Sequence, residues 1–313
     1  MSKRIIYSIN CVNLKIISEM DKNMNNIKYS KRIELFLVDG NPDGIITAEI
    51  SNWNGKTIKI PRSEIRNSTR EDLKKAGVYF LICKEDDSSH SVYIGEAENI
   101  QNRLLCHIND YNAGKEKYYW FEALIFIGND LNKTSIRYLE NKLVNFTKAA
   151  KRVRVLTKNT YKNTVIKESE SSPLEEFLYY VKLIMNTLGY KFLEPVISQE
   201  TNKQEYLFLN SKETNAKGLI TNEGFVVLKG SVISNGITQS FTKDKRNKLR
   251  EKLINDGTIK GFKFTKDYIF SSPSSAASII RGTAINGLSE WKNSDGKSIK
   301  DLQKRIADSV YCE

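Results

Sequence analysis

The sequence predicts an α+β fold, with a small antiparallel sheet and flanking helices followed by a second small α+β domain. Short apolar runs bounded by turn residues alternate with helix-length periodic segments, a pattern typical of strands in hairpins packed against helices. The chain has 313 residues, 40% hydrophobic and 27% charged, which is enough for two soluble domains with a core each. A polar stretch over residues 195–205 marks the expected boundary between them.

The first part of the chain is predicted to be a leader followed by strands. Residues 1–30 are polar and are expected to form the leader, and residues 31–76 an N-terminal β segment. The elements expected there are a strand in residues 32–40 with a turn at 39–44, strands Ile45–Ile50 and Thr57–Ile60 joined by a hairpin turn at Asn54-Gly55, and a short helix over Ser68–Lys75.

The central part, residues 77–194, is predicted to form a domain with a helical extension. Thr134 is expected to cap one helix, and Ser172-Pro173 to start another that stops at Gly189. The elements expected there are strands Val78–Ile82, Val92–Ile94 and Trp120–Ile127, and helices Ala97–Tyr111, Ser135–Ala150 and residues 172–188.

The last part, residues 206–310, is predicted to form the second domain. Ser272-Pro273 repeats the signature of a helix start, with Ser as the cap and Pro in the first turn. The elements expected there are strands Tyr206–Asn210, Ala216–Thr221, Gly224–Lys229 and Asp267–Phe270, a charged helix Thr242–Asp256, a helix after Ser272, a hairpin at 289–298 and a helix Ile299–Asp308.

The composition narrows the class of protein. A net charge of +12 favours an anionic partner, and nucleic acid is the commonest one. No run of 18 apolar residues predicts a membrane span, and the start M-S-K-R-I-I-Y-S-I-N-C does not read as a secretory signal, so we expect a cytoplasmic protein. The four cysteines form no C-x-x-C pair, which disfavours structural zinc and disulfides. They are expected to be reduced and mostly buried.

Four polar side chains fall on consecutive elements of the central part. Tyr79 and Tyr93 lie on neighbouring predicted strands, where an antiparallel pairing can bring their rings onto one face, although strand tyrosines usually just pack. Arg103 and His107 are one helical turn apart on one flank of an apolar stripe. Such a pair can bind a phosphate, or it can simply be a solvated flank with a half-buried histidine.

Glu140 is the most informative side chain. On a helical wheel it falls between Leu143 and Val144, inside the apolar stripe of its helix. An unpaired buried carboxylate costs several kcal/mol or shifts its pKa. Glu140 therefore needs a cation, strong donors or a metal ion, and an ion pair with Arg103 is the alternative without chemistry.

The ordered set G-V-Y, Y-I-G, Arg-x-x-x-His and a lone helical glutamate resembles the GIY-YIG nuclease family over residues 77 to about 160. This resemblance implies a small sheet with flanking helices that cleaves DNA phosphodiesters with one divalent metal, Mg²⁺ or Mn²⁺. The chain departs from the family in having Val78 in the first motif and 14 positions between the two tyrosines. A surface hairpin loop tolerates that length at small entropic cost.

The resemblance also implies a role for each matching residue. Tyr79 corresponds to the proposed general base, Tyr93 to the residue that positions the phosphate or the water, and Arg103 to the arginine that stabilises charge on the phosphate. His107 corresponds to an auxiliary histidine and Glu140 to the metal ligand. The family's asparagine after the glutamate helix corresponds to Asn159, with Asn163 as the alternative.

The chemistry suits these residue types. One Mg²⁺ held by a carboxylate and waters acts as a Lewis acid, and a guanidinium can neutralise the charge that grows on the phosphate. A tyrosine, with an ordinary pKa of about 10, is a poor base unless nearby positive charge lowers that pKa. We expect Arg103 and the metal to supply this charge.

The C-terminal part offers a basic helix. Lys245, Arg246, Lys248 and Arg250 can lie along a phosphate backbone, although a solvated charged helix explains them equally well.

Residues 271–298 resemble the small C-terminal domain of unknown function often fused to GIY-YIG nucleases, which implies engagement of DNA. They are also similar to a small module associated with restriction enzymes and adenine methylases. The segment from residue 32 resembles the leader of the same fusion group. Trp291 is expected in the core.

The sequence therefore predicts a metal-dependent DNA endonuclease with DNA as its partner. The alternative is a non-catalytic DNA-binding protein on the same scaffold, which reads modified DNA or acts as a regulator, and RNA remains open as a substrate. The sequence leaves open the target, nicking versus double-strand cleavage, the biological pathway and the oligomeric state.

Overall fold

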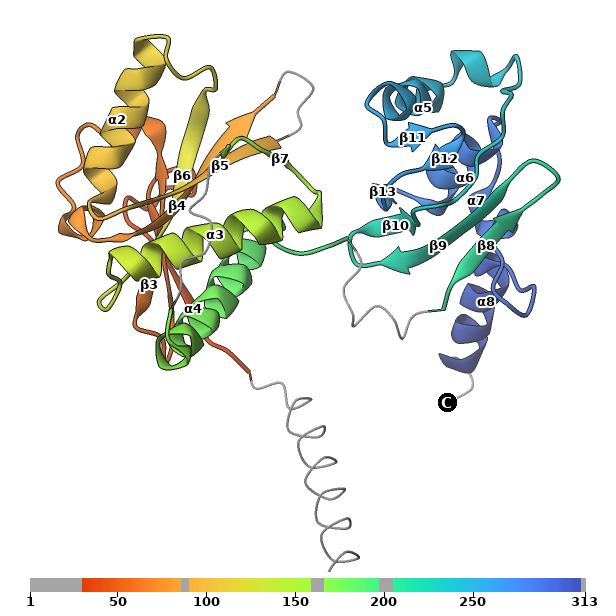
Figure 1. The fold of residues 1–313 in the computed structure, drawn as a ribbon. Coiled ribbons are helices and arrows are strands. Elements are labelled where there is room, and N and C mark those ends of the chain that lie inside the picture. The colour runs from red at the N-terminus through yellow and green to blue at the C-terminus, as the bar shows by residue number, and fades with distance from the viewer. Residues whose placement is uncertain (1–29, 86–89, 159–165, 197–204, 311–313) are drawn as a thin grey trace, which may run out of the picture. The chain divides into compact units, whose positions relative to one another are not determined.

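The structure, a computed structural model, describes residues 30–85, 90–158, 166–196 and 205–310. It divides into two compact units (Figure 1). Unit 1 consists of the chain up to Asn145 together with Val153–Tyr190, and unit 2 consists of Phe146–Arg152 and the chain from Lys191 onward. No helix in the described part of the chain has the length and apolar content that a membrane crossing needs.

Unit 1 is built on a seven-stranded sheet of order β1-β2-β3-β6-β4-β5-β7. Its strands are β1 Ile33–Leu37, β2 Ile46–Ile50, β3 Gly55–Pro61, β4 Gly77–Lys84, β5 His90–Ala97, β6 Trp120–Gly128 and β7 Arg154–Val155. All neighbours are antiparallel except β5 and β7, which are parallel. Because β3 pairs with β6 along seven residues, the N-terminal strands extend the sheet that carries the central strands.

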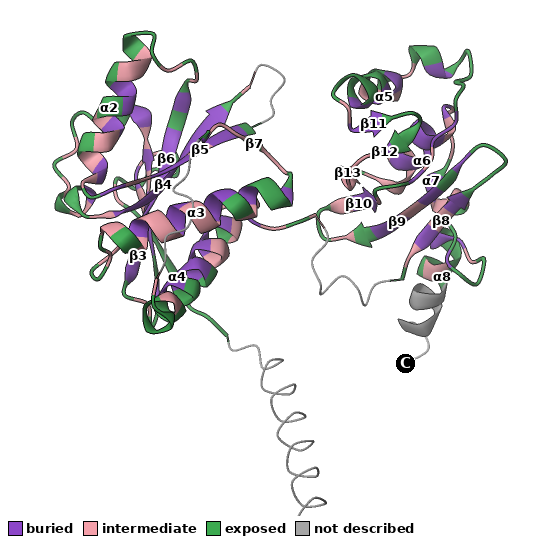
Figure 2. Cartoon of the chain, viewed as in Figure 1, coloured by how far each residue is buried: buried purple, intermediate pink, exposed green. Residues whose placement is uncertain are grey.

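Within the described residues, three α-helices and two short 3₁₀ segments accompany this sheet. They are α2 Ile100–Asn112, α3 Lys133–Ala150, α4 Glu168–Thr187, and the 3₁₀ segments Arg62–Glu64 and Glu71–Lys74. The apolar side of α2 packs on one face of the sheet, in a core shared with β3, β4 and β6. Figure 1 shows α3 and α4 lying together, away from α2, and Figure 2 shows β4, β5 and β6 almost wholly buried between the helices.

The predicted hairpin turn at Asn54-Gly55 is wrong. The chain turns at Ser51-Asn52, where Asn52 has a φ of +66°, a backbone conformation that Asn tolerates better than most residues. Gly55 instead begins β3, with the Trp53 ring only 2.2 Å from the place where a Cβ would lie. The glycine is therefore explained by the close approach of an indole rather than by turn geometry.

Several predicted helix starts also shift. Ser68–Lys75 forms only the 3₁₀ segment at Glu71–Lys74, and Ala97 belongs to β5. The side chain of Asn99 caps α2 by accepting from the Asn102 N–H at 3.0 Å. Asn132, and not Thr134, caps α3 by accepting from the Ser135 N–H at 2.9 Å.

Helix α4 starts five residues before Pro173, so Ser172 does not cap it. Pro173 is the sixth residue of α4, so the helix lacks one intrahelical hydrogen bond at this position. The two-residue strand β7 was not predicted, because so short a segment has no periodicity to read.

Unit 2 is a small α+β domain with a four-stranded antiparallel sheet of order β13-β10-β9-β8 and a two-stranded hairpin. Its strands are β8 Leu207–Asn210, β9 Asn215–Thr221, β10 Gly224–Val227, β11 Ile259–Lys260, β12 Lys263–Phe264 and β13 Tyr268–Phe270. Its helices are α5 Lys245–Asn255, α6 Pro273–Arg281, α7 Gly287–Glu290 and α8 Ile299–Val310, with a 3₁₀ segment at Phe241–Lys243. The predicted helix Thr242–Asp256 is thus broken at Asp244, which caps α5, and the hairpin β11–β12 was not predicted.

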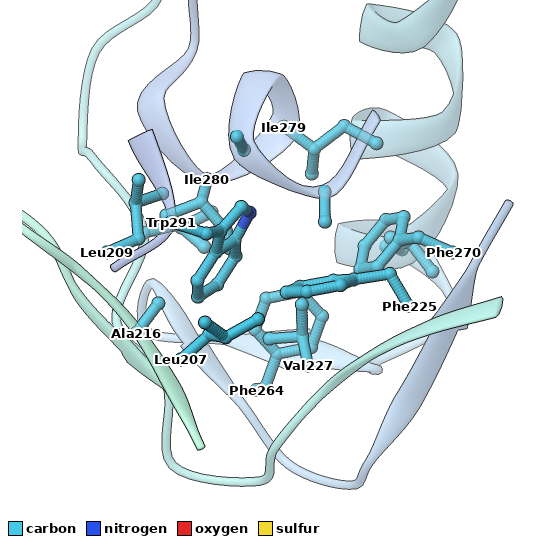
Figure 3. Packing of buried hydrophobic residues seen from close by; sticks show 14 of the residues in the cluster. Leu207, Leu209, Ala216, Phe225, Val227, Phe264, Phe270, Ile279, Ile280 and Trp291 are labelled. Carbon is cyan, nitrogen blue, oxygen red and sulfur yellow. The ribbon is translucent and has the colours of Figure 1, made fainter. Parts of the chain in front are cut away.

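The core of unit 2 confirms two sequence predictions (Figure 3). Trp291 is fully buried, its ring lies 4.6 Å from that of Phe225, and its indole N–H donates to the Pro273 carbonyl at 3.1 Å. Ser272 caps α6 by accepting from the Ser275 N–H, with Pro273 as the first helical residue.

Candidate active site

A single cavity of about 700 Å³ gathers most of the predicted site residues. Tyr79, Tyr93, Arg103 and Glu140 all line it, and they come from β4, β5, α2 and α3. His107 lies behind Tyr79 and does not line the cavity. Asn159 and its alternative Asn163 lie outside the described residues.

The register of β4 against β5 sets the two phenols. Tyr79 pairs with Gly95 and Tyr93 with Leu81, so both tyrosines lie on the face that α2 covers. Their rings are 6.3 Å apart and nearly parallel. A Cβ on Gly95 would lie 2.4 Å from the Tyr79 hydroxyl, so the glycine of Y-I-G makes room for the tyrosine of G-V-Y.

The cavity lies at the end of β5, where the pairing on its outer side stops. Strand β7 pairs with β5 only at Ser91 and Val92. The Thr157 hydroxyl then accepts from the Ile94 N–H and donates to the Ile94 carbonyl, both at 2.8 Å, in place of a strand neighbour. Beyond Ile94 no described strand covers this edge, which leaves Glu96 and the groups around it open to the cavity.

Both phenols are protonated at neutral pH. Burial raises the pKa of Tyr79 well above its ordinary value and outweighs the Arg103 guanidinium, which lowers it. Burial likewise raises the pKa of Tyr93, again against Arg103. Arg103 therefore lowers the tyrosine pKa, as expected. Its effect is smaller than that of burial, because desolvation disfavours the phenolate more strongly.

His107 is fully buried rather than half-buried as its helical position suggested. Its Nε2 lies 2.9 Å from the Tyr79 hydroxyl and its Nδ1 lies 2.6 Å from a Glu116 oxygen. Burial, followed by the charges of Arg103 and Arg62, lowers the pKa of His107 to about 3. The imidazole is therefore neutral at neutral pH.

Glu140 is the buried carboxylate that the sequence predicted. Its residue is 6% exposed, and its Oε2 has no hydrogen-bond partner among the described residues. Burial, reinforced by the charge of Glu96, raises the pKa of Glu140 to about 7, against the cations Lys133, Arg103 and Arg137. No ion pair within 4.0 Å joins Glu140 to the described Arg103, so the alternative without chemistry is not realised.

Three groups near the site were missed by the sequence reading. Glu96 follows the Y-I-G motif directly, and Lys133 begins α3, where it lies 3.0 Å from a Glu96 oxygen. Both line the cavity. Strand alternation could have placed Glu96 beside the motif, whereas Glu116 sits in a loop with no periodic signal.

The cysteines are partly as expected. Cys83 is buried, and burial raises the pKa of its thiol to about 12. Cys106 is exposed and lines the cavity. Cys11 and Cys312 lie outside the described residues.

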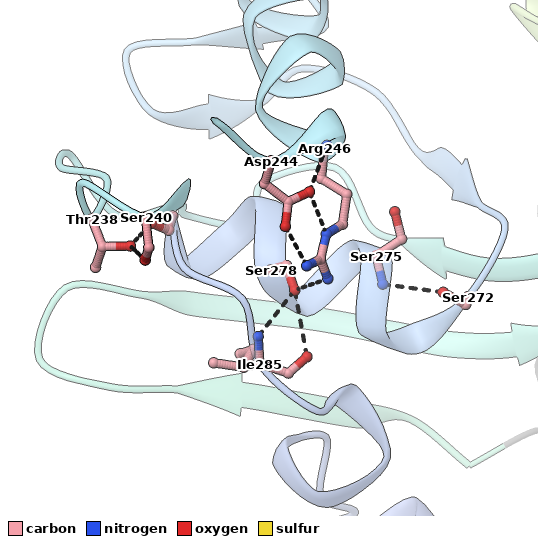
Figure 4. Close-up of polar contacts among 9 residues, drawn as sticks. Thr238, Ser240, Asp244, Arg246, Ser272, Ser275, Ser278 and Ile285 are labelled. Carbon is pink, nitrogen blue, oxygen red and sulfur yellow. Dashed lines mark hydrogen bonds and ion pairs between the residues drawn. The ribbon is translucent and has the colours of Figure 1, made fainter. Parts of the chain in front are cut away.

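The basic helix α5 divides into two kinds of residue. Lys245 and Lys248 are exposed. Arg246 is held by Asp244 and by the Ser278 hydroxyl at 2.7 Å (Figure 4). Arg250 is 3% exposed and donates to the carbonyls of Ile279 and Ser234. The prediction that Arg250 contacts the phosphate backbone of DNA is therefore wrong, because its donors already bind carbonyl groups within the fold.

Comparison with known proteins agrees with the motifs. Residues 75–154 match the family model described as the GIY-YIG catalytic domain, and residues 207–303 match the model described as a domain of unknown function (DUF4357). No curated protein and no solved structure matches the chain. The chain therefore contains a GIY-YIG catalytic domain, of the nuclease type that cleaves DNA, with a DUF4357 domain C-terminal to it.

Proposed function

We propose that this protein is a metal-dependent endonuclease that hydrolyses phosphodiester bonds in DNA. The observation that carries the proposal is the buried Glu140 carboxylate. Its Oε2 has no hydrogen-bond partner among the described residues, and Glu140 lines the same cavity as Arg103 and the two tyrosines. A carboxylate left without a donor in a site with a raised pKa is a frequent mark of function.

The residues fit a divalent cation. Among the described residues, no group of three or more His, Cys, Asp or Glu side chains could hold a metal by itself. The lone carboxylate of Glu140, with water and substrate phosphate oxygens, suits Mg²⁺ or Mn²⁺, since such ions keep several waters and take few protein ligands. Bound there, the ion would supply Lewis-acid chemistry to the phosphate.

The chain's own side chains have separate tasks in this proposal. Arg103 lines the cavity and is a permanent cation, so it can donate to the non-bridging oxygens as charge grows on them. Tyr79 accepts a proton from the attacking water, and Tyr93, stacked beside it, positions the water or the phosphate. In unit 2, Lys245 and Lys248 are the two of the four predicted α5 contacts that are exposed and can contact the DNA backbone.

Free thiols at Cys83 and Cys106 fit a reducing compartment, and we place the activity in the cytoplasm.

The test is a plasmid-nicking assay with the full chain, with Mg²⁺ or Mn²⁺ and with a chelator. Cleavage is expected only with metal. Its rate is expected to fall by at least about a hundredfold in Glu140→Gln and in Arg103→Ala. Glu98→Gln is the matched control, because Glu98 lines the same cavity but its side chain is 68% exposed. An RNA of the same sequence, run beside the DNA, tests the choice of nucleic acid.

A gel-shift measurement across a salt series belongs with this assay. Salt-dependent DNA binding without cleavage by the wild-type protein would contradict the enzyme and support a non-catalytic DNA-binding protein. Wild-type cleavage that persists in Glu140→Gln would reject the site while leaving a nuclease in place.

A further inference from the structure

Two fully buried side chains and one partly buried side chain form a hydrogen-bonded series that leads away from the cavity. Glu116 Oε1 lies 2.6 Å from His107 Nδ1, and His107 Nε2 lies 2.9 Å from the Tyr79 hydroxyl. Tyr79 and His107 are fully buried, and the Glu116 side chain is 16% exposed. At these distances both contacts are direct hydrogen bonds, with no water between the groups.

The loop after α2 is built to bring Glu116 back beneath that helix. The N–H groups of Lys115 and Glu116 both donate to the Asp110 carbonyl, at 2.9 and 3.2 Å. These two hydrogen bonds to one carbonyl reverse the chain directly after the helix. The side chain of Glu116, nine residues beyond His107, thereby reaches Nδ1 of the imidazole.

The direction of each hydrogen bond follows from the chemistry of the groups. An ionised carboxylate can only accept, so His107 Nδ1 must carry the proton. In a neutral imidazole, Nε2 then holds the lone pair, and Tyr79 must donate to it. The lone pairs of the Tyr79 oxygen thereby remain for other partners, namely the Arg103 guanidinium, which hydrogen-bonds to this phenol, and a water that gives up its proton.

We propose that Glu116 is a positioning residue, which fixes the tautomer of His107 and so orients the Tyr79 hydroxyl for catalysis. This deepens the nuclease proposal and rests on it for the catalytic part. As Tyr79 takes a proton from the attacking water, its own phenolic proton moves to His107 Nε2. The resulting imidazolium carries protons on both nitrogens, and the Glu116 carboxylate balances its charge. As the alcohol departs, Tyr79 passes the proton it took from water to the leaving oxygen, and the Nε2 proton returns to Tyr79, so no proton is gained or lost.

The surroundings of Glu116 suit this role. Arg62 is 9% exposed and stacks among the rings of Tyr111, Tyr119 and Trp120, at 4.7 to 5.1 Å from each. Burial raises the pKa of Glu116 above its ordinary value, and the charge of Asp110 adds to the rise. The hydrogen bond with Tyr118 and the charges of Arg103 and Arg62 oppose the rise and favour the carboxylate form.

A purely structural role for Glu116, as an anchor of the loop, predicts different results. An anchor affects stability and leaves the histidine tautomer and the chemical step unchanged once the protein is folded. A positioning residue changes the tautomer and kcat together, with little effect on the KM for DNA. The two roles are therefore separated by one spectroscopic and one kinetic measurement.

The chain contains only two histidines, which makes the spectroscopic test direct. In ¹⁵N-labelled full-length protein, we expect His107 to show a protonated Nδ1 and an unprotonated Nε2, while the exposed His90 provides the reference. Glu116→Gln keeps an acceptor oxygen and is expected to keep this tautomer. Glu116→Leu removes the acceptor and is expected to yield the Nε2–H tautomer, and kcat is expected to fall on the order of a hundredfold.

Asp110→Asn is the matched control, because Asp110 lies in the same turn and the substitution leaves its backbone carbonyl in place. It is expected to leave both the tautomer and kcat unchanged. A wild-type His107 protonated on Nε2 would overturn the proposal, as would a folded Glu116→Leu with an unchanged tautomer and kcat. If Glu116→Leu does not fold, the wild-type and Glu116→Gln spectra decide. The tautomer is read without cleavage, so an inactive wild-type protein would reject the nuclease function separately from the hydrogen-bond assignment.

Discussion

Tyr79 and Gly95 lie directly opposite each other on β4 and β5, and the Tyr79 hydroxyl lies 2.4 Å from the point where a Gly95 Cβ would be. The first and second motifs are therefore one packing unit. The glycine of the second lets the tyrosine of the first cross β5, where its hydroxyl lies 2.9 Å from His107 Nε2.

This relationship predicts that Gly95→Ala displaces Tyr79. The new methyl group must push the phenol away from His107, because overpacking of a dense core forces side chains out of place. We expect a loss of about 1–3 kcal/mol in the free energy of unfolding and a marked loss of nicking, measured by denaturant unfolding and plasmid cleavage. Gly236→Ala, which meets no atom within 4 Å, is the control. Full activity in Gly95→Ala would show that the phenol does not need its position over β5.

Glu140 is predicted to cost stability when no metal is bound. Its folded pKa of about 7 lies above the ordinary 4.5, so its contribution to stability is full below pH 4.5 and is lost as the pH rises through 7. Glu140→Gln should therefore raise the unfolding free energy by about 2 kcal/mol at pH 8 in chelator, measured by denaturant unfolding. Added Mg²⁺ should stabilise the wild type and not the variant. Equal stabilisation of both would place the ion elsewhere.

His107 is predicted to contribute to acid unfolding. Its pKa is about 3 when folded against 6.5 ordinarily, so the unfolded chain binds the proton first as the pH falls. The stability from this group is full above pH 6.5 and is lost as the pH falls toward 3, with a slope of up to about 1.4 kcal/mol per pH unit. In His107→Gln this slope should be absent, whatever the variant's overall stability. His90→Gln, an exposed control, should keep it. A wild-type slope retained in His107→Gln would mean that other groups carry the acid sensitivity.

Arg250 and Lys248 of α5 are predicted to have opposite effects. Arg250→Ala leaves two carbonyls without their donors and should cost about 2–4 kcal/mol of stability. Lys248→Ala removes an exposed cation and should leave stability unchanged while weakening DNA binding and lowering the salt slope by about one. Unfolding curves and gel shifts in a salt series measure both. Unchanged DNA affinity in Lys248→Ala at low salt would remove α5 from the proposed DNA-binding surface.

The sequence by itself determined the elements that have a strong local signal. Short apolar runs located β4 and β6, helical apolar periodicity located α3, and the Ser-Pro start located α6. The position of Glu140 in the apolar stripe of α3 predicted a buried carboxylate. The order of motifs along the chain was enough to identify the catalytic domain, since residues 75–154 match that family. These inferences hold because hydrophobic periodicity and residue order are properties of the chain itself.

Only the tertiary structure decided which polar groups meet. Register placed Gly95 beneath Tyr79, the reversal at Asp110 brought Glu116 to His107, and packing against α6 turned Arg250 from a surface cation into a buried donor. Caps and turns such as Asn132 and Asn52 were likewise settled by the local backbone path. The physical reason is that a hydrogen bond acts over about 3 Å, while the partners that meet at these sites are 9 to 29 positions apart. Their meeting depends on chain reversals and strand pairing that no local pattern encodes.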